Sequence, residues 1–208
     1  EGLRPLAHVD FWTPLVLGIA ALVGAWRLQQ LARREAPGAL GNFSLLGLAQ
    51  LLLVWGAAWW ALALSSEVLR FVGPELQSAA LLGLLALSMA TASFLAPRAR
   101  WPELALLCSL LIPMAAVVLL YAWHLHYHPA AQFGWLAWAL LFAVHFWSLR
   151  RLAGLLPAGA LSAAHVLGCW LLLGVLALEL RYLFFALSEH YNAWRWLGWA
   201  LLPSGYLW

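Results

Sequence analysis

Three histidines whose spacing could support chemistry occur in one short run, His-Leu-His-Tyr-His over residues 124–128, directly before Pro129. In a helical run His124 and His128 share one face and His126 points away, whereas in an extended run all three imidazoles point the same way. The extended form could bind Zn²⁺ or Cu²⁺, although no carboxylate or cysteine lies adjacent. We predict no metal centre and keep these histidines as the alternative site. Interfacial polar capping and an acid–base or anion-binding role are the other interpretations.

Two carboxylate–arginine sets stand at the ends of long apolar stretches. Glu67 and Arg70 are three residues apart, so they can pair on one face of a helix. Glu179 and Arg181 stand close together near the end of a later stretch. With the three histidines, these four residues are the candidates for general acid–base chemistry on a sugar or a lipid-linked substrate. The competing interpretation is that loops outside a membrane are polar because water surrounds them. The same side holds further polar residues, namely His8, Asp10, Glu189, His190, Tyr191 and Arg195.

The composition limits the class of protein that positions these side chains. The chain has 208 residues, of which 65% are hydrophobic and only 9% are charged. A soluble domain carries roughly 25% charged residues, so a water-soluble globule is excluded. The high apolar content and the two cysteines also exclude a disordered chain and a disulfide scaffold. The net charge is +3, but the sequence contains no basic patch interleaved with aromatic residues, so we expect no nucleic-acid partner. The sequence therefore predicts an all-α, polytopic transmembrane bundle in a lipid bilayer.

Six apolar stretches are predicted to cross the membrane as full spans, with part of a seventh. A helix needs about 20 residues to cross the bilayer, so the first stretch, which is the shortest, has only a marginal length. We treat residues 1–208 as a single transmembrane module. We also expect this module to be a fragment of a longer chain, because the last stretch is too short to cross. The full spans cover about residues 11–26, 42–66, 76–96, 103–123, 131–149 and 158–178, and the partial one covers 194–208.

Arginine placement orients the predicted bundle, since the chain contains no lysine. With the amino terminus outside, seven arginines fall on the inner side and four on the outer side. Loops on the cytoplasmic side carry an excess of basic residues, so this orientation is favoured over the reverse. The inner arginines are Arg27, Arg33, Arg34, Arg98, Arg100, Arg150 and Arg151, and the outer ones are Arg4, Arg70, Arg181 and Arg195.

Few polar groups lie inside the predicted spans. His145 and His165 fall on neighbouring antiparallel helices, about one helical turn apart in depth. We favour a structural role, in which each bonds to a carbonyl or hydroxyl, over a proton relay or haem ligation, and we expect no cofactor. Cys108 and Cys169 are expected to behave as small apolar residues. Pairs of small residues that could seat close helix contacts occur at Ala20/Gly24, Ala79/Gly83 and Ala164/Gly168.

Several stretches in the second half of the chain are similar to those of a known family. They are HP at 128–129, GWLAW at 134–138, HFWSLRRL at 145–152, LELR at 178–181 and WRWLGWALLP at 194–203. Together they resemble the large predicted membrane proteins of Gram-negative bacteria, a family of unassigned function with many consecutive spans. The resemblance covers mainly residues 121–208. It implies a bacterial inner-membrane protein far longer than this chain, and it carries no catalytic residues.

These observations lead to one predicted function and two alternatives. We predict an inner-membrane module, with its amino terminus in the periplasm, of a larger protein that transports or handles an envelope glycan or lipid-linked component. The first alternative is a structural or assembly subunit whose spans only bind other spans. The second is a membrane-embedded transferase that uses His124, His126 or His128 as a base at a periplasmic site. The expected partners are the lipid bilayer and other transmembrane helices, of the same chain or of a complex, and the sequence leaves open whether the protein is an enzyme.

Overall fold

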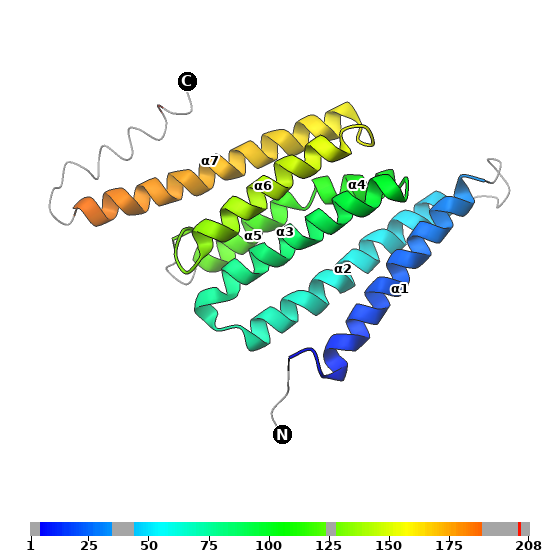
Figure 1. Ribbon diagram of the computed structural model, residues 1–208, viewed down its shortest axis with the longest axis horizontal. Helices are drawn as coiled ribbons and strands as arrows, with labels where there is room; N and C mark the ends of the chain where they lie inside the picture. The colour runs from blue at the N-terminus through cyan, green and yellow to red at the C-terminus, as the bar shows by residue number, and fades with distance from the viewer. Residues whose placement is uncertain (1–4, 35–43, 124–127, 189–203, 205–208) are drawn as a thin grey trace.

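The computed structural model describes residues 5–34, 44–123, 128–188 and 204, and its regular elements in these ranges are all α-helices. Figure 1 shows them running back and forth as an antiparallel bundle. We group them into a first hairpin (α1–α2), a second hairpin (α3 with α4–α5) and a third hairpin (α6–α7). The helices are α1 Val9–Ala32, α2 Leu45–Phe71, α3 Pro74–Arg98, α4 Pro102–Ser109, α5 Ile112–Trp123, α6 Gly134–Leu152 and α7 Ala158–Ser188.

The helical, multi-span class predicted from composition is confirmed. Within the described ranges, five segments are long and apolar enough to cross a membrane, namely Val9–Ala32, Leu45–Phe71, Pro74–Arg98, Pro102–Ala122 and Ala158–Phe184. The stretch 131–149, also predicted to be a full span, forms α6 and is not in this set. Its 19 residues include His145 and two arginines. The predicted partial span 194–208 lies outside the described residues except for Ser204.

Helix α6 can be less apolar than its neighbours because of where its polar residues lie. It contacts α3, α4 and α7, and nine of its residues are buried. His145 and Ser148 lie on this buried face, and the two arginines lie in the last turn, so these residues lower the hydropathy without placing a charge in the middle of the helix. A count of spans based on hydropathy alone therefore misses this helix.

The fourth predicted span, 103–123, forms two consecutive helices instead of one. Helix α4 ends at Ser109 and α5 begins at Ile112. Pro113 explains the break, since its ring has no N–H to donate and would clash with the carbonyl four residues earlier in a continuous helix. The turn tightens instead, and the amide of Leu111 donates to the carbonyl of Cys108 at 3.2 Å.

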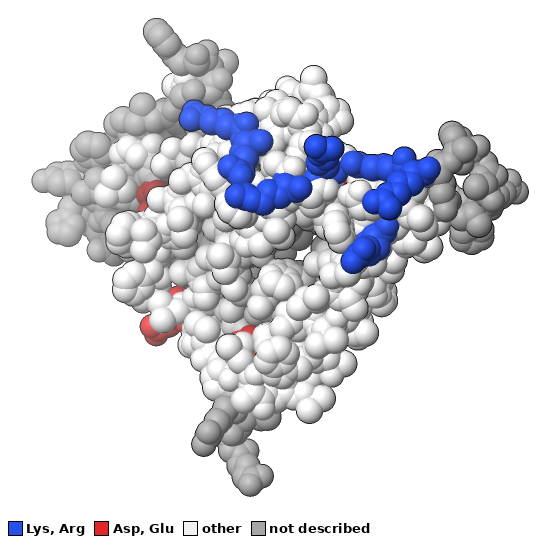
Figure 2. All heavy atoms as spheres, turned by 45° about the vertical axis from the view of Figure 1, so that its right-hand side comes forward, with Lys and Arg blue, Asp and Glu red and all other residues white. Residues whose placement is uncertain are grey.

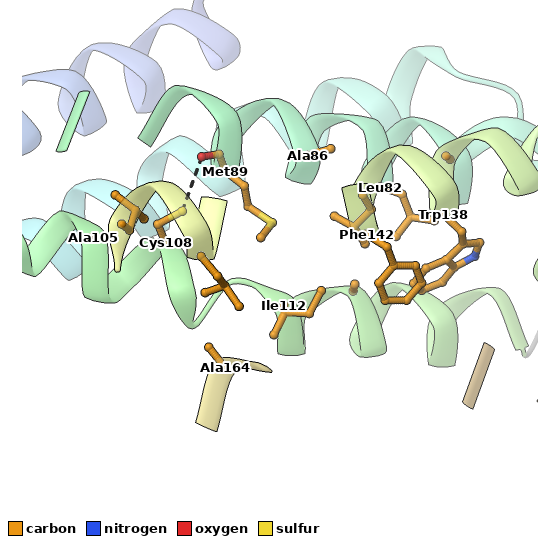
Figure 3. Close-up of a cluster of buried hydrophobic side chains, with 14 of the residues drawn as sticks. Leu82, Ala86, Met89, Ala105, Cys108, Ile112, Trp138, Phe142 and Ala164 are labelled. Atoms are coloured by element: carbon orange, nitrogen blue, oxygen red, sulfur yellow. Dashed lines mark hydrogen bonds between the residues drawn. The ribbon is translucent and has the colours of Figure 1, made fainter. Parts of the chain in front are cut away.

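The main apolar core lies between the second and third hairpins. Figure 3 shows Leu82, Ala86 and Met89 of α3 facing side chains from α4, α5 and α6. The Cys108 thiol within this core donates to the Met89 carbonyl at 3.5 Å. The first hairpin has one small apolar cluster of its own and shares a second with Trp101 and α4. Side-chain hydrogen bonds also join it to the second hairpin. Among them are Trp60 Nε1 to Ser88 Oγ, Gln29 Nε2 to Glu103, and Gln30 Nε2 to the Ala99 carbonyl.

The two ends of the bundle differ in the predominant sign of their charged residues. Figure 2 shows the arginines gathered in one band across the end where α1, α3 and α6 terminate, and we call this the arginine end. Helix carboxyl termini favour cations, which suits this placement. The described charged residues of the arginine end are Arg27, Arg33, Arg34, Arg98, Arg100, Glu103, Arg150 and Arg151. Those of the opposite, acidic end are Asp10, Glu67, Arg70, Glu75, Glu179 and Arg181.

Candidate functional site

At the acidic end, each of the three hairpins has a side-chain contact between a residue on or just before its first helix and a residue on its last helix, and we call each such contact a latch. In the first latch His8 immediately precedes α1, and Glu67 lies in the last turns of α2. Nε2 of His8 is 2.7 Å from Oε1 of Glu67, and the Leu6 amide donates to Oε2 at 3.0 Å. The two side chains are only 7% and 10% exposed, so the imidazole and the carboxylate are buried side by side, and the hydrogen bond to the carboxylate comes from the Leu6 amide.

The third latch repeats this arrangement with different residues. His128 precedes α6, and its Nδ1 lies 3.2 Å from both carboxylate oxygens of Glu179 on α7. The amide of Ala130 donates to the same carboxylate. The imidazole stacks on the ring of Tyr182, with centroids 3.8 Å apart. In both latches, then, a glutamate of the second helix lies against a histidine and accepts a hydrogen bond from a backbone amide, and both come from the segment that precedes the first helix.

The second latch is uncharged. The Tyr121 hydroxyl of α5 donates to Oε1 of Gln77 on α3 at 2.7 Å. Nε2 of Gln77 donates in turn to the carbonyls of Leu69 and Val72, where α2 ends. Gln77 therefore closes its own hairpin and also caps the first one. Neither Gln77 nor Tyr121 was among the candidate residues expected from the sequence, although each lies within a turn of the end of a predicted span.

The sequence-predicted candidates fall into two groups. Glu67 and Arg70 belong to the first hairpin, but they do not form the expected pair with each other. Glu67 contacts His8, while Arg70 lies 3.5 Å from Asp10, with both side chains of that ion pair well exposed. An exposed ion pair of this kind contributes little to stability. His128 and Glu179 form the third latch, and Arg181 is exposed two residues further along α7. His124 and His126 lie outside the described residues.

The intramembrane histidines have structural contacts. His145 is fully buried, and its Nε2 lies 3.2 Å from the Ala164 carbonyl of α7. Phe146 contacts both imidazoles, edge-on to His145 and stacked on His165. Gly168 makes room for the imidazole of His145, since a Cβ there would lie 2.5 Å from Nε2. The contact of His145 with a backbone carbonyl is the one expected for a structural role, and that role stays a prediction.

The chemistry of the described acidic end is that of histidine–carboxylate pairs. Among the residues that the structure describes, no three histidine, cysteine or acidic side chains are grouped to hold a metal ion. A carboxylate beside an imidazole fixes the orientation of the ring, which is the arrangement a general base requires. The same groups also accept and donate hydrogen bonds to hydroxyl-rich ligands.

The first latch makes a direct prediction about stability. Replacing Glu67 with alanine leaves the Leu6 amide without its acceptor and the His8 imidazole without its carboxylate neighbour in a buried site. We expect the free energy of unfolding to fall by about 1–3 kcal/mol. Denaturant titration in mixed micelles measures it. The matched control is Glu75→Ala, which removes an exposed carboxylate from the same end and should change the value by less than about 0.5 kcal/mol. Equal losses in the two variants would contradict the latch.

Comparison with known proteins identifies one relationship. A family described as "Predicted membrane protein (DUF2339)" matches residues 3–208. The match extends well beyond residues 121–208, where the sequence resemblance was mainly placed, and includes the first two hairpins. No curated protein and no solved structure matches the chain.

Proposed function

The chain belongs to the DUF2339 family of predicted membrane proteins, and from this premise we propose that it is the inner-membrane module of a larger bacterial protein that transports or handles an envelope component. A glycan or a lipid-linked precursor is the class of component that the acidic end suits. Such a ligand offers many hydroxyls, which carboxylates, imidazoles and guanidinium groups can bind. The site lies at the acidic end, among the first and third latches.

One observation carries the proposal, namely that two glutamates are held by histidines at the same end of the bundle. Ionisable groups at the ends of or within spans are costly to bury, so their presence favours a function. Glu67 is 8% exposed, and Glu179 is partly open beside His128 and Tyr182. Carboxylate, imidazole and a stacked aromatic ring are the groups that a sugar-binding or acid–base site uses.

We further propose that the arginine end faces the cytoplasm and the acidic end the periplasm. The described arginine end carries seven arginines and one glutamate, and the acidic end two arginines and four acidic residues. The positive-inside rule then places the amino terminus outside. Labelling of a single cysteine introduced beside Arg33 in intact cells tests this, and modification by a membrane-impermeant reagent would reverse the orientation.

A transferase is the alternative that the third latch favours. His128 has a carboxylate partner, with Nδ1 of its ring 3.2 Å from Glu179, and so has the orientation that a catalytic base needs. A structural or assembly subunit is favoured by a different feature of the same latches. Both carboxylates already accept backbone amides from their own chain, which is how a purely structural contact would use them.

The experiment that tests the proposed function replaces four residues together, Glu67→Gln, Arg70→Gln, Glu179→Gln and Arg181→Gln. We expect this variant to reach the membrane and yet fail to complement a deletion strain of the source organism. The matched control, Glu75→Gln, removes a carboxylate of the same end that stands outside the latches and should complement. Full complementation by the quadruple variant overturns the proposal and favours the assembly subunit.

A further inference from the structure

We propose that the arginine end binds the phosphodiester headgroup of an anionic phospholipid between the guanidinium groups of Arg98 and Arg151. This site lies where α3 and α6 end side by side, at the opposite end of the bundle from the latches. It is therefore independent of the function proposed above. Its ligand would be a component of the bilayer itself, held at the level of the headgroups.

The geometry brings two like charges to one aromatic ring. Cζ of Arg98 lies 3.4 Å from the ring centroid of Phe94, and Cζ of Arg151 lies 5.3 Å from the same centroid. Both distances are measured from the same ring centroid. The separation of the two Cζ atoms is therefore no greater than the sum of these two distances. A cation over an aromatic face is favourable, but two cations beside one ring repel each other unless an anion joins them.

Both guanidinium groups are held in place by backbone carbonyls. Arg98 donates from Nη1 to the Phe94 carbonyl at 3.2 Å, and Arg151 donates from Nε to the Ser93 carbonyl at 3.0 Å. A guanidinium group has five N–H donors, so each arginine keeps donors for a ligand. A planar guanidinium fork matches two phosphate oxygens, which gives a bidentate contact that lysine cannot make.

No protein carboxylate neutralises this pair within the described residues. The acidic side chain that the structure describes at this end, Glu103, accepts instead from Gln29 of the first hairpin. An arginine held in this way usually forms an ion pair with an acidic residue. Without one, the combined charge of Arg98 and Arg151 attracts an external anion.

The surroundings favour a lipid over a soluble anion. Phe94 and Trp147 are 48% and 44% exposed on the outside of the bundle, next to the two arginines. Leu95 adds further exposed apolar surface. A phospholipid presents a phosphodiester directly above a glycerol and two acyl chains, so it meets the charged and the apolar parts of this surface together.

Lipid titration of the purified, delipidated chain in detergent, followed by native mass spectrometry, tests the site. We expect dioleoylphosphatidylglycerol to bind the unsubstituted chain more tightly than dioleoylphosphatidylcholine. The double variant Arg98→Gln/Arg151→Gln should lose about tenfold or more of the phosphatidylglycerol affinity. The control Arg27→Gln/Arg33→Gln removes two charges from the same end. Its phosphatidylglycerol affinity should fall by less than about threefold, because only the general electrostatic attraction of that end is reduced. Equal losses in the two double variants, or no preference between the lipids, overturn the proposal.

A second measurement needs no substitution and so does not depend on whether a variant folds. Phosphatidylglycerol that carries a photoreactive headgroup is cross-linked to the unsubstituted chain, and the modified peptides are identified. We expect cross-links within residues 93–101 and 147–151. Cross-links spread evenly over the arginine end, or concentrated at the acidic end, would show that no site exists between α3 and α6.

Discussion

Replacing Gly56 with alanine is expected to lower the free energy of unfolding by about 1–3 kcal/mol, because the added methyl group has no room. A Cβ at Gly56 would lie 3.0 Å from both the Gly18 carbonyl oxygen and the Leu22 amide nitrogen, and 2.9 Å from Cγ of Leu22. Two of these three atoms belong to the backbone of α1 and cannot turn away. The two helices would have to separate along their whole contact.

The contact is reciprocal, which makes the prediction specific to this crossing. A Cβ at Gly18 would lie 3.0 Å from the Trp60 amide and 3.1 Å from the Gly56 carbonyl oxygen. Once one alanine has separated the helices, the second has more room. We therefore expect Gly18→Ala/Gly56→Ala to cost less than the sum of the single substitutions.

The control is Gly83→Ala on α3, where a new Cβ meets nothing within 4 Å. It should change stability by no more than about 0.5 kcal/mol. Denaturant titration in mixed micelles measures all of the variants, and hydrogen exchange should assign the loss to α1 and α2. If Gly56→Ala and Gly83→Ala behave alike, the close approach of α1 and α2 is wrong.

Spacing explains why the sequence did not single out this crossing. The sequence signal for close contacts is a pair of small residues four apart. Of the three such pairs, Ala164/Gly168 lies at the close contact of α7 with His145 of α6, whereas Gly83 meets nothing and Gly24 makes only an ordinary 3.6 Å contact with Leu52. The buried small residues of α2 instead repeat every seven positions, at Ala49, Gly56 and Ala63. That period keeps one face of a helix against a partner in a left-handed crossing. A search at this period would have found the interface.

Much of the architecture follows from hydropathy and arginine placement, because both act along a single helix. Apolar length predicts which segments are helical, and alternation of the spans brings the arginines to one end, as Figure 2 shows. The break at Pro113 could also have been predicted from the sequence, since a proline at the eleventh residue of the span 103–123 removes a helical hydrogen bond. The buried face of α6 could not, because it depends on which helices pack against it.

The candidate site shows the same limit. The sequence placed His8, Glu67, His128 and Glu179 on one side, and this grouping matches the acidic end of the structure. It did not predict which imidazole meets which carboxylate, because that depends on how the ends of different helices pack. Their proximity in the chain suggested an ion pair between Glu67 and Arg70. In the structure the buried carboxylate of Glu67 lies beside His8 instead.

Replacing Gly168 with alanine is the second substitution expected to have a large effect. The new Cβ would lie 2.5 Å from Nε2 and 2.7 Å from Cδ2 of His145, whose side chain is fully buried and packed edge-on against Phe146. The imidazole would have to move and lose its hydrogen bond to the Ala164 carbonyl. Steric strain and the lost bond together are expected to cost about 2–4 kcal/mol of unfolding free energy, measured by denaturant titration in mixed micelles.

Two comparisons separate this clash from a general intolerance of α7 to substitution. Gly174→Ala adds the same methyl group six residues along the helix, where a Cβ meets nothing within 4 Å, and should be nearly neutral. In a chain that already carries His145→Ala, the Gly168→Ala substitution should lose most of its cost, because the atoms it strikes are gone. A full cost in that background would mean that Gly168 is required for a reason other than the imidazole. The close packing of α7 on α6 would then not depend on His145.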